Sequence, residues 1–137
     1  MITVKSYLDK SKVHGIGVFA DTEIKKGTVV WKFNPLVDLV FTKNKWFRLK
    51  NKLNKECFEE LEKYSYKQKN KFYLCIDNGQ FMNHGIKNCN LYNDFKTDTL
   101  VAVKDIKKGE ELICNYYEFC DEDDKNLTII KSLNLDN

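Results

Sequence analysis

A change in the spacing of apolar residues limits the fold more than any other feature of this sequence. Over residues 42–64, apolar residues recur at steps of three and four with charged residues between them, which predicts an amphipathic helix, broken near Asn51 or Asn54. On both sides of this segment, short apolar runs bounded by turn residues indicate β-strands. The sequence therefore predicts a mainly β protein with a helical insertion, of the α+β class. The expected strands lie within 2–4, 18–20, 28–33, 72–77, 98–103 and 111–114.

Length and composition favour one soluble domain. The 137 residues, of which 42% are hydrophobic, suffice for one packed core and leave little room for a second. The five cysteines are odd in number and form no C-x-x-C pair, so we expect reduced thiols, with neither a disulfide framework nor a metal site. The first ten residues carry lysine and aspartate where a signal peptide has its apolar stretch. We therefore expect an intracellular protein without a membrane partner, in either the cytoplasm or the nucleus.

The charge balance argues against nucleic acid as the main partner. The net charge is only +3, and Arg48 is the sole arginine, although arginine is the residue best suited to recognise phosphates and guanine edges. The lysines of the helical segment are interleaved with glutamates, as on a solvated helix face. A small basic nucleic-acid-binding domain remains an alternative interpretation. The glutamates are Glu56, Glu59, Glu60 and Glu62.

Two polar motifs stand where strands are expected to end. In KVHGIGVFA, residues 12–20, Gly15 and Gly17 allow the backbone to turn tightly and expose its amides and carbonyls to a ligand, although a plain β-turn explains the same residues. In DNGQFMNHG, residues 77–85, an apolar pair is followed by Asn83 and His84, which usually form a hydrogen-bonded structural pair. With only two histidines in the chain and no evident nucleophile for His84 to activate, neither a metal centre nor a His-based nucleophilic mechanism is expected.

A third motif, VAVKDIKKGEELICNYY at residues 101–117, completes a recognisable order. The order of motifs over residues 3–119 resembles that of the SET domain of protein-lysine methyltransferases. The motifs are GxGVFA, a helical insertion, FMNHG, and GEEL followed by NYY. The likeness is strongest to the small stand-alone SET domains of viruses and bacteria. It implies one SET domain of several short sheets with a C-terminal pseudoknot. Its parts would be N-terminal strands with the GxG loop (1–37), the helical insertion (38–71), the C-terminal motifs (72–119) and a tail (120–137).

The resemblance implies an S-adenosylmethionine-dependent enzyme that methylates lysine side chains of a protein, with a histone tail as one candidate substrate and no metal. Tyr116 is the implied catalytic residue. Tyr64 and Tyr66, from the insertion, and Cys114 and Tyr117 are the implied contacts of the substrate lysine. The implied cofactor-binding residues are His14, Gly15, Ile16, Gly17, Asn83, His84, Tyr116 and Phe119.

The sequence also departs from the family pattern. The usual NHSCxPN is NHGIKNCN here, which leaves open whether Asn88 or Asn90 takes the place of the second asparagine. The usual Asp-Tyr pair is Asn115-Tyr116. No cysteine cluster follows to close the lysine channel, so the tail or the second subunit of a homodimer must do so. A catalytically inactive SET-fold module that binds a protein is therefore an alternative function.

Two further expectations concern the substrate. In the resemblance, a tyrosine two residues before the terminal tyrosine crowds the amine, and the smaller Cys114 in its place predicts transfer of two or three methyl groups. The acidic run DEDD at 121–124 either attracts a basic peptide to the site or is part of a solvated tail.

Overall fold

The N-terminal part of the chain is a two-stranded hairpin that carries the GxG loop. The structure is a computed structural model that describes residues 1–135. β1 (Ser6–Lys10) pairs with the antiparallel strand β2 (Ile16–Ala20). Gly15, in the connecting loop, has a φ of +52°, a left-handed conformation that favours glycine. The turn predicted between two strands is therefore present, and its second glycine, Gly17, lies within β2.

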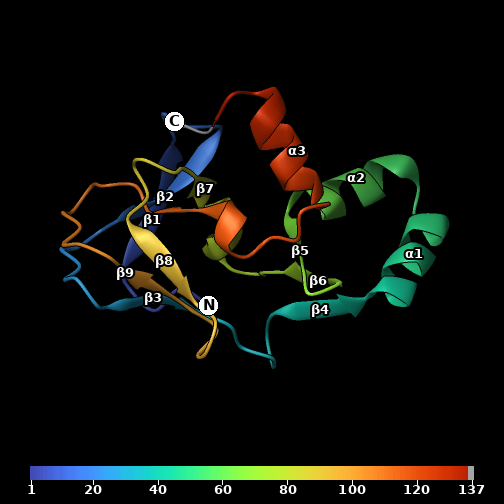
Figure 1. The fold of residues 1–137 in the computed structure, drawn as a ribbon, viewed down its shortest axis with the longest axis horizontal. Coiled ribbons are helices and arrows are strands. Elements are labelled where there is room, and N and C mark those ends of the chain that lie inside the picture. Colours follow the sequence, from blue (N-terminus) through green and yellow to red (C-terminus); the bar gives the residue numbers. More distant parts are fainter. Residues whose placement is uncertain (136–137) are drawn as a thin grey trace.

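A five-stranded sheet lies next to this hairpin (Figure 1), and its strand order differs from the chain order. β10 lies between β7 and β8 and is parallel to both, although it follows both in the chain. The segment 85–90 that joins β7 to β8 must therefore cross β10, and such threading is rare in proteins. It corresponds to the implied pseudoknot. The sheet order is β3 (Val29–Lys32), β9 (Thr99–Ala102), β8 (Leu91–Asp94), β10 (Ile113–Cys114) and β7 (Asn83–His84).

The insertion forms a three-stranded sheet with two helices and a small core of its own. The predicted helix is divided into α1 and α2, and the break falls at Leu53 and Asn54, where the Asn54 side chain caps α2 by accepting a hydrogen bond from the Cys57 N–H at 2.8 Å. Trp46 of α1 stacks on Phe72, with ring centroids 4.3 Å apart. The elements are β4 (Leu39–Thr42), α1 (Lys43–Lys52), α2 (Lys55–Lys63), β5 (Ser65–Gln68) and β6 (Lys71–Leu74), and the strand order is β4-β6-β5.

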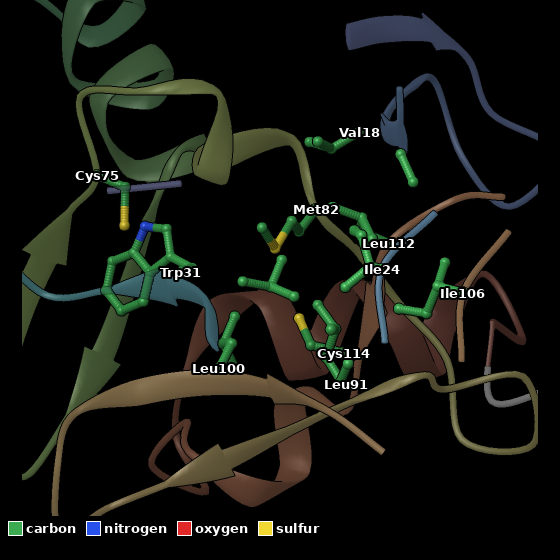
Figure 2. Close-up of a cluster of buried hydrophobic side chains, with 13 residues drawn as sticks. Val18, Ile24, Trp31, Cys75, Met82, Leu91, Leu100, Ile106, Leu112 and Cys114 are labelled. Atoms are coloured by element: carbon green, nitrogen blue, oxygen red, sulfur yellow. The ribbon is translucent and has the colours of Figure 1, made fainter. Parts of the chain in front are cut away.

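The main hydrophobic core joins β2 to the central sheet (Figure 2). Val18, Leu91, Ile106 and Leu112 are fully buried in it, and burying a side chain of this kind contributes about 1.5–3 kcal/mol. Trp31 marks one end of the core, beside Cys75. Because strands from both ends of the chain meet here, the core fixes the motif around β2 relative to the motifs around β7 and β10.

The C-terminal segment corrects the prediction of a polar tail over 120–137. After the short helices η1 (Asn78–Phe81) and η2 (Tyr116–Glu118), the chain forms α3 (Lys125–Ser132). Asp124 caps α3 by accepting a hydrogen bond from the Asn126 N–H at 2.7 Å, and α3 buries Leu127 and Ile130. Apolar residues at steps of three, continuing to Leu133, explain why this segment folds back onto the domain; residues 136–137 lie outside the described residues.

The acidic run at 121–124 attaches this segment to β5, an edge strand. Asp121 accepts hydrogen bonds from two backbone N–H groups of the β5–β6 turn, at 2.7 and 2.9 Å, and its own N–H donates to the Lys67 carbonyl at 2.8 Å. Asp124 accepts a bond from the Lys67 N–H, and Asp123 pairs with the Lys67 ammonium. The run is therefore not a solvated tail, because three of its four carboxylates hold the β5 edge. Its effect on substrate attraction stays a prediction.

Over residues 1–135 the fold is a β-rich mixture of small sheets and helices, as predicted from the sequence, with α3 as the helix that was not predicted. Among residues 1–135, no helix has the length and apolar character needed to cross a lipid bilayer.

Candidate active site

Glu111 links the GxG loop to the Asn-His motif. The Asn83 side-chain N–H group donates to the Ile16 carbonyl at 3.1 Å and to Glu111 Oε1 at 2.8 Å, and the Ser11 hydroxyl donates to Glu111 Oε2 at 2.9 Å. A Cβ at Gly17 would lie 2.2 Å from Glu111 Oε1, so a larger residue here would displace the Glu111 carboxylate from this network. Both donors of the network converge on one carboxylate, so the Asn83 carbonyl oxygen Oδ1 is left as the acceptor that this side chain can offer to a ligand ammonium group.

The parallel pairing of β7 with β10 brings His84 next to Tyr116. The Tyr116 backbone N–H donates to His84 Nδ1 at 3.0 Å, and the two rings meet edge to face with centroids 5.4 Å apart. Asn115 Oδ1 accepts a hydrogen bond from the Tyr117 N–H at 3.1 Å and so caps η2. An aspartate makes the same kind of cap, so the replacement of the usual Asp by Asn115 preserves the local structure.

Tyr116 is a partly buried, neutral phenol. Its hydroxyl donates a hydrogen bond to the Met82 carbonyl oxygen at 2.5 Å. Burial raises its pKa well above the ordinary tyrosine value, and the nearby thiol of Cys114 adds to the shift. The side chain therefore cannot act as an anionic base near neutral pH, but its oxygen lone pairs can accept a hydrogen bond from an amine.

Asn90, rather than Asn88, has the buried structural position in NHGIKNCN. Asn90 is 4% exposed, donates from Nδ2 to the Glu111 carbonyl at 2.7 Å, and accepts from the Ile113 N–H at 2.8 Å. Asn88 is exposed. Asn90 therefore joins the segment 85–90 to β10 at the crossing, which makes it the better match to the second asparagine of the family motif.

A cavity of about 370 Å³ opens between the GxG loop, β7 and α3. This volume lies within the range of about 300–1,000 Å³ typical of small-molecule sites. One wall is backbone and polar side chains, and the opposite wall is apolar and comes largely from α3. The lining residues are Val13, His14, Gly15, Ile16, Lys63, Tyr64, Gln80, Phe81, Met82, Asn83, His84, Tyr116, Asn126, Ile129, Ile130, Leu133 and Leu135.

A second cavity, of about 90 Å³, reaches from Tyr116 into the core. Cys114 lines it, and burial raises the pKa of its thiol, which keeps the sulfur neutral. Trp31 also lines it; its buried indole nitrogen has no hydrogen-bond partner among the described residues and lies on the side of Cys75 in Figure 2. The lining residues are Trp31, Lys63, Tyr64, Ser65, Tyr66, Cys75, Gly79, Gln80, Met82, Asn93, Leu100, Cys114, Tyr116, Phe119 and Asn126.

The residues predicted for the site are divided unevenly between the two cavities. Tyr64 lines both, and Tyr66 lines the smaller one, where its ring meets that of Phe119 at 5.3 Å. Phe119, predicted to contact the cofactor, lines the smaller cavity and not the larger. Tyr117, predicted to contact substrate, lines neither; its ring lies 5.3 Å from His84. Gly17 is buried in the network around Glu111 and is also absent from both linings.

The sequence interpretation missed the contribution of α3 to the larger cavity. Ile129, Ile130 and Leu133 of the C-terminal segment form its apolar wall, and Asn126 lines both cavities. The apolar spacing in NLTIIKSL is a helix signal that, together with its position just after NYY, would have pointed to this role. Nothing in the sequence pattern singled out Glu111.

A comparison with known protein families identifies the family of this chain. Residues 15–117 match the SET domain family. The chain belongs to the SET domain family. The match includes Gly15 at one end and Tyr116 at the other, so it covers most of the residues that line both cavities; Val13, His14, Phe119 and the residues of the C-terminal segment lie outside it. The SET domain is typical of S-adenosylmethionine-dependent lysine methyltransferases.

Solved SET structures share the fold at low sequence identity. A candidate histone methyltransferase of Plasmodium falciparum is 23% identical with a TM-score of 0.55, over 84% of this chain and 95% of that chain. The Neurospora SET domain protein DIM-5, a histone lysine methyltransferase, is 19% identical with a TM-score of 0.57, over 88% of this chain and 55% of that chain. Polycomb Repressive Complex 2 of Chaetomium thermophilum, in an autoinhibited conformation bound to S-adenosylmethionine, is 20% identical with a TM-score of 0.62.

The last match covers 93% of this SET domain and only 17% of the Chaetomium chain. The matched regions thus make up nearly all of the solved Plasmodium chain, about half of the solved DIM-5 chain and less than a fifth of the solved Polycomb chain. No curated protein matches it. Within residues 1–135, no group of three or more histidine, cysteine or carboxylate side chains is arranged to hold a metal ion.

Proposed function

We propose that this SET domain is an S-adenosylmethionine-dependent protein-lysine N-methyltransferase. The observation that carries the proposal is the junction of the two cavities at Tyr116. The larger cavity has the size and mixed lining of a cofactor site, and the smaller one has the narrow, mainly apolar lining that suits a lysine stem. The residues that line both are Lys63, Tyr64, Gln80, Met82, Tyr116 and Asn126.

The residues of the larger cavity fit S-adenosylmethionine. The loop around Gly15 exposes backbone groups, and Asn83 Oδ1 is the acceptor for an ammonium group. Phe81 and the α3 residues Ile130 and Leu133 supply apolar contacts for an adenine ring. When bound, S-adenosylmethionine supplies a methyl group carried by a positively charged sulfur.

Methyl transfer needs a neutral amine whose lone pair is aimed at the methyl group, so positioning supplies much of the catalysis. The hydroxyl hydrogen of Tyr116 is already donated to the Met82 carbonyl, which leaves the Tyr116 oxygen to accept an N–H of the lysine amine and orient it. The apolar walls of the smaller cavity, with Cys114 neutral, disfavour an ammonium ion and so lower the pKa of the bound lysine. Tyr64 and Tyr66 contact the lysine stem in this proposal.

The alternative of an inactive protein-binding module has lost one of its supports. It was motivated in part by Asn115, which caps η2 as an aspartate would. Its other support, the altered motif NHGIKNCN, remains, and measurement of S-adenosylmethionine binding distinguishes the two functions.

The test uses Tyr116→Phe. Loss of the hydroxyl should leave the fold and S-adenosylmethionine affinity unchanged while single-turnover methylation falls about 10²-fold or more, as when one oriented hydrogen-bonding group is removed from a reacting centre. Tyr92→Phe, on an exposed tyrosine of β8 that lines neither cavity, is the control with the same chemical change.

Labelled S-adenosylmethionine and a mixture of protein substrates provide the assay. Histones come first, because two of the similar structures are named as histone methyltransferases, one of them a candidate. Equal single-turnover rates for Tyr116→Phe and Tyr92→Phe would remove Tyr116 from the chemistry. Absence of S-adenosylmethionine binding to the unmodified protein would overturn the proposed function itself.

A further inference from the structure

The break between the two helices of the insertion separates its charges. α1 contains five cations and no acidic residue, whereas α2 contains four glutamates and two lysines. The interleaving of lysines with glutamates expected from the sequence therefore applies to α2 and not to α1. The cations of α1 are Lys43, Lys45, Arg48, Lys50 and Lys52.

α1 carries the whole positive excess of the protein. Removing its five cations from the 23 basic residues of the chain leaves 18 basic residues against 20 acidic ones. The rest of the molecule is thus slightly acidic. Three of the four glutamates of α2 form ion pairs with lysines of α2 and α3: Glu59 with Lys55, Glu60 with Lys63 and Glu62 with Lys125. These three are therefore paired with cations other than those of α1.

The cations of α1 have no ion-pair partner among the described residues. Lys45 and Lys50 lie over the rings of Phe41 and Phe58 at 5.1 and 5.9 Å, and both remain exposed. Lys43 and Lys45 are also in the first turn of the helix, where the helix dipole favours acidic residues over basic ones. Lys50 and Lys52, in the last turn, do suit the helix dipole, so helix stability leaves Lys43, Lys45 and Arg48 unexplained.

The cations and an aromatic ring share the outer surface of α1. Trp46 and Leu49 face the core of the insertion. At 100° per residue, Asn44 and Asn51 lie opposite this core side, with Arg48 on one side of them and Phe47, which is 46% exposed, on the other. Lys45, Arg48 and Lys52, three and four residues apart, form an exposed stripe along the side of the helix that carries Arg48.

We propose that the outer face of α1 binds the phosphate backbone of nucleic acid. Three of the five cations, Lys45, Arg48 and Lys52, follow one side of the helix over about 10 Å, which is one charge per about 5 Å and of the same order as the one charge per about 3.4 Å of a nucleic acid strand. Arg48 and the two asparagines can hydrogen-bond to phosphates and base edges, and Phe47 can stack on an unpaired base. An anionic membrane fits less well, because Phe47 is the only large apolar residue on this face.

The surface is separate from the catalytic cavities. α1 lies at the right-hand end of the molecule in Figure 1, away from β7 and the GxG loop before β2. Nucleic acid bound to α1 therefore leaves the cavities accessible to a protein substrate. This inference does not depend on methyltransferase activity, and the following experiment measures binding alone.

The experiment measures binding of fluorescently labelled 20-nucleotide single-stranded and duplex DNA by anisotropy over a range of salt concentrations. The unmodified protein should bind, with a slope of log affinity against log salt of about −3 or steeper. The triple variant Lys45→Gln, Arg48→Gln, Lys52→Gln should lose about tenfold or more in affinity, and its slope should become shallower by about three units, because each lost phosphate contact removes about one unit. Circular dichroism checks that the variant is folded.

The control carries the same change of charge elsewhere. Lys26, in the loop between β2 and β3, and Lys104 and Lys107, in the loop between β9 and β10, are exposed. Both loops lie at the opposite end of the molecule from α1 in Figure 1. Replacing all three with glutamine should leave affinity and salt slope nearly unchanged. Equal losses in the two triple variants would overturn the proposal, since they would show only an effect of net charge. Binding to phosphatidylserine vesicles or poly-glutamate without binding to either DNA would overturn it as well.

Discussion

Replacing Asn90 with alanine should destabilise the whole domain. The Asn90 side chain is buried at the point where the segment 85–90 crosses β10, with one hydrogen bond to the Glu111 carbonyl and one from the Ile113 N–H. Alanine removes both bonds and leaves two buried backbone groups without partners. Each such group costs about 1–3 kcal/mol, so the expected loss is about 2–6 kcal/mol of the free energy of unfolding.

This loss is large against the total stability of about 5–15 kcal/mol that is usual for a domain. With a urea m-value of about 2 kcal/mol/M, the midpoint of unfolding should fall by about 1–3 M with m unchanged. Asn88→Ala is the matched control, because Asn88 is exposed two residues earlier, and its effect should stay within about 0.5 kcal/mol. Equal midpoints for the two variants would refute the argument that Asn90 holds the crossing.

Three other predictions address the cofactor wall, the product and the thiols. Ile130→Asp places a charge in the apolar wall formed by α3 and should weaken S-adenosylmethionine binding, measured by calorimetry, about tenfold or more. Thr128→Asp, on the exposed side of the same helix, should leave this binding unchanged. Mass spectrometry of a peptide driven to completion should show two or three added methyl groups, and Cys114→Tyr should stop at one; one methyl group in both proteins would remove the gate from this position. A thiol reagent at pH 8 should modify the exposed Cys57 at once but Cys75 only after unfolding. Burial raises the pKa of the Cys75 thiol to about 12, so little of the reactive thiolate forms at pH 8. Rapid reaction of both cysteines in the folded protein would contradict this prediction.

Much of the fold could be predicted because local patterns matched the final structure. The apolar runs around Val18, Val30 and Leu100 became strands, and the helical spacing from 42 to 64 became α1 and α2. The pairing of β10 with β7 and β8 depends on contacts far apart in the sequence, so only the family resemblance implied it. The segment after Phe119 was misjudged because its acidic beginning was given more weight than its apolar spacing.

The site was predicted less completely than the fold. The motifs located Asn83, His84 and Tyr116, which the structure brings together through the β7–β10 pairing. Glu111 was missed because a glutamate beside the turn ending at Gly109 resembles an ordinary surface charge until Asn83 and Ser11 are seen to converge on it. The two cavities are properties of packing and have no local signal.

The position of β10 between β7 and β8 also determines when the protein can fold during its synthesis. Until residues 113–114 have left the ribosome, the nascent chain has β7 and β8 without the strand that joins them, and their unpaired edges can associate with other chains. Contacts such as Asn83 with Ile113 also join distant parts of the chain, which slows folding. The candidate site around Tyr116 therefore cannot assemble before residues 113–116 have been synthesised, and a chain interrupted before them is a candidate for chaperone binding or aggregation.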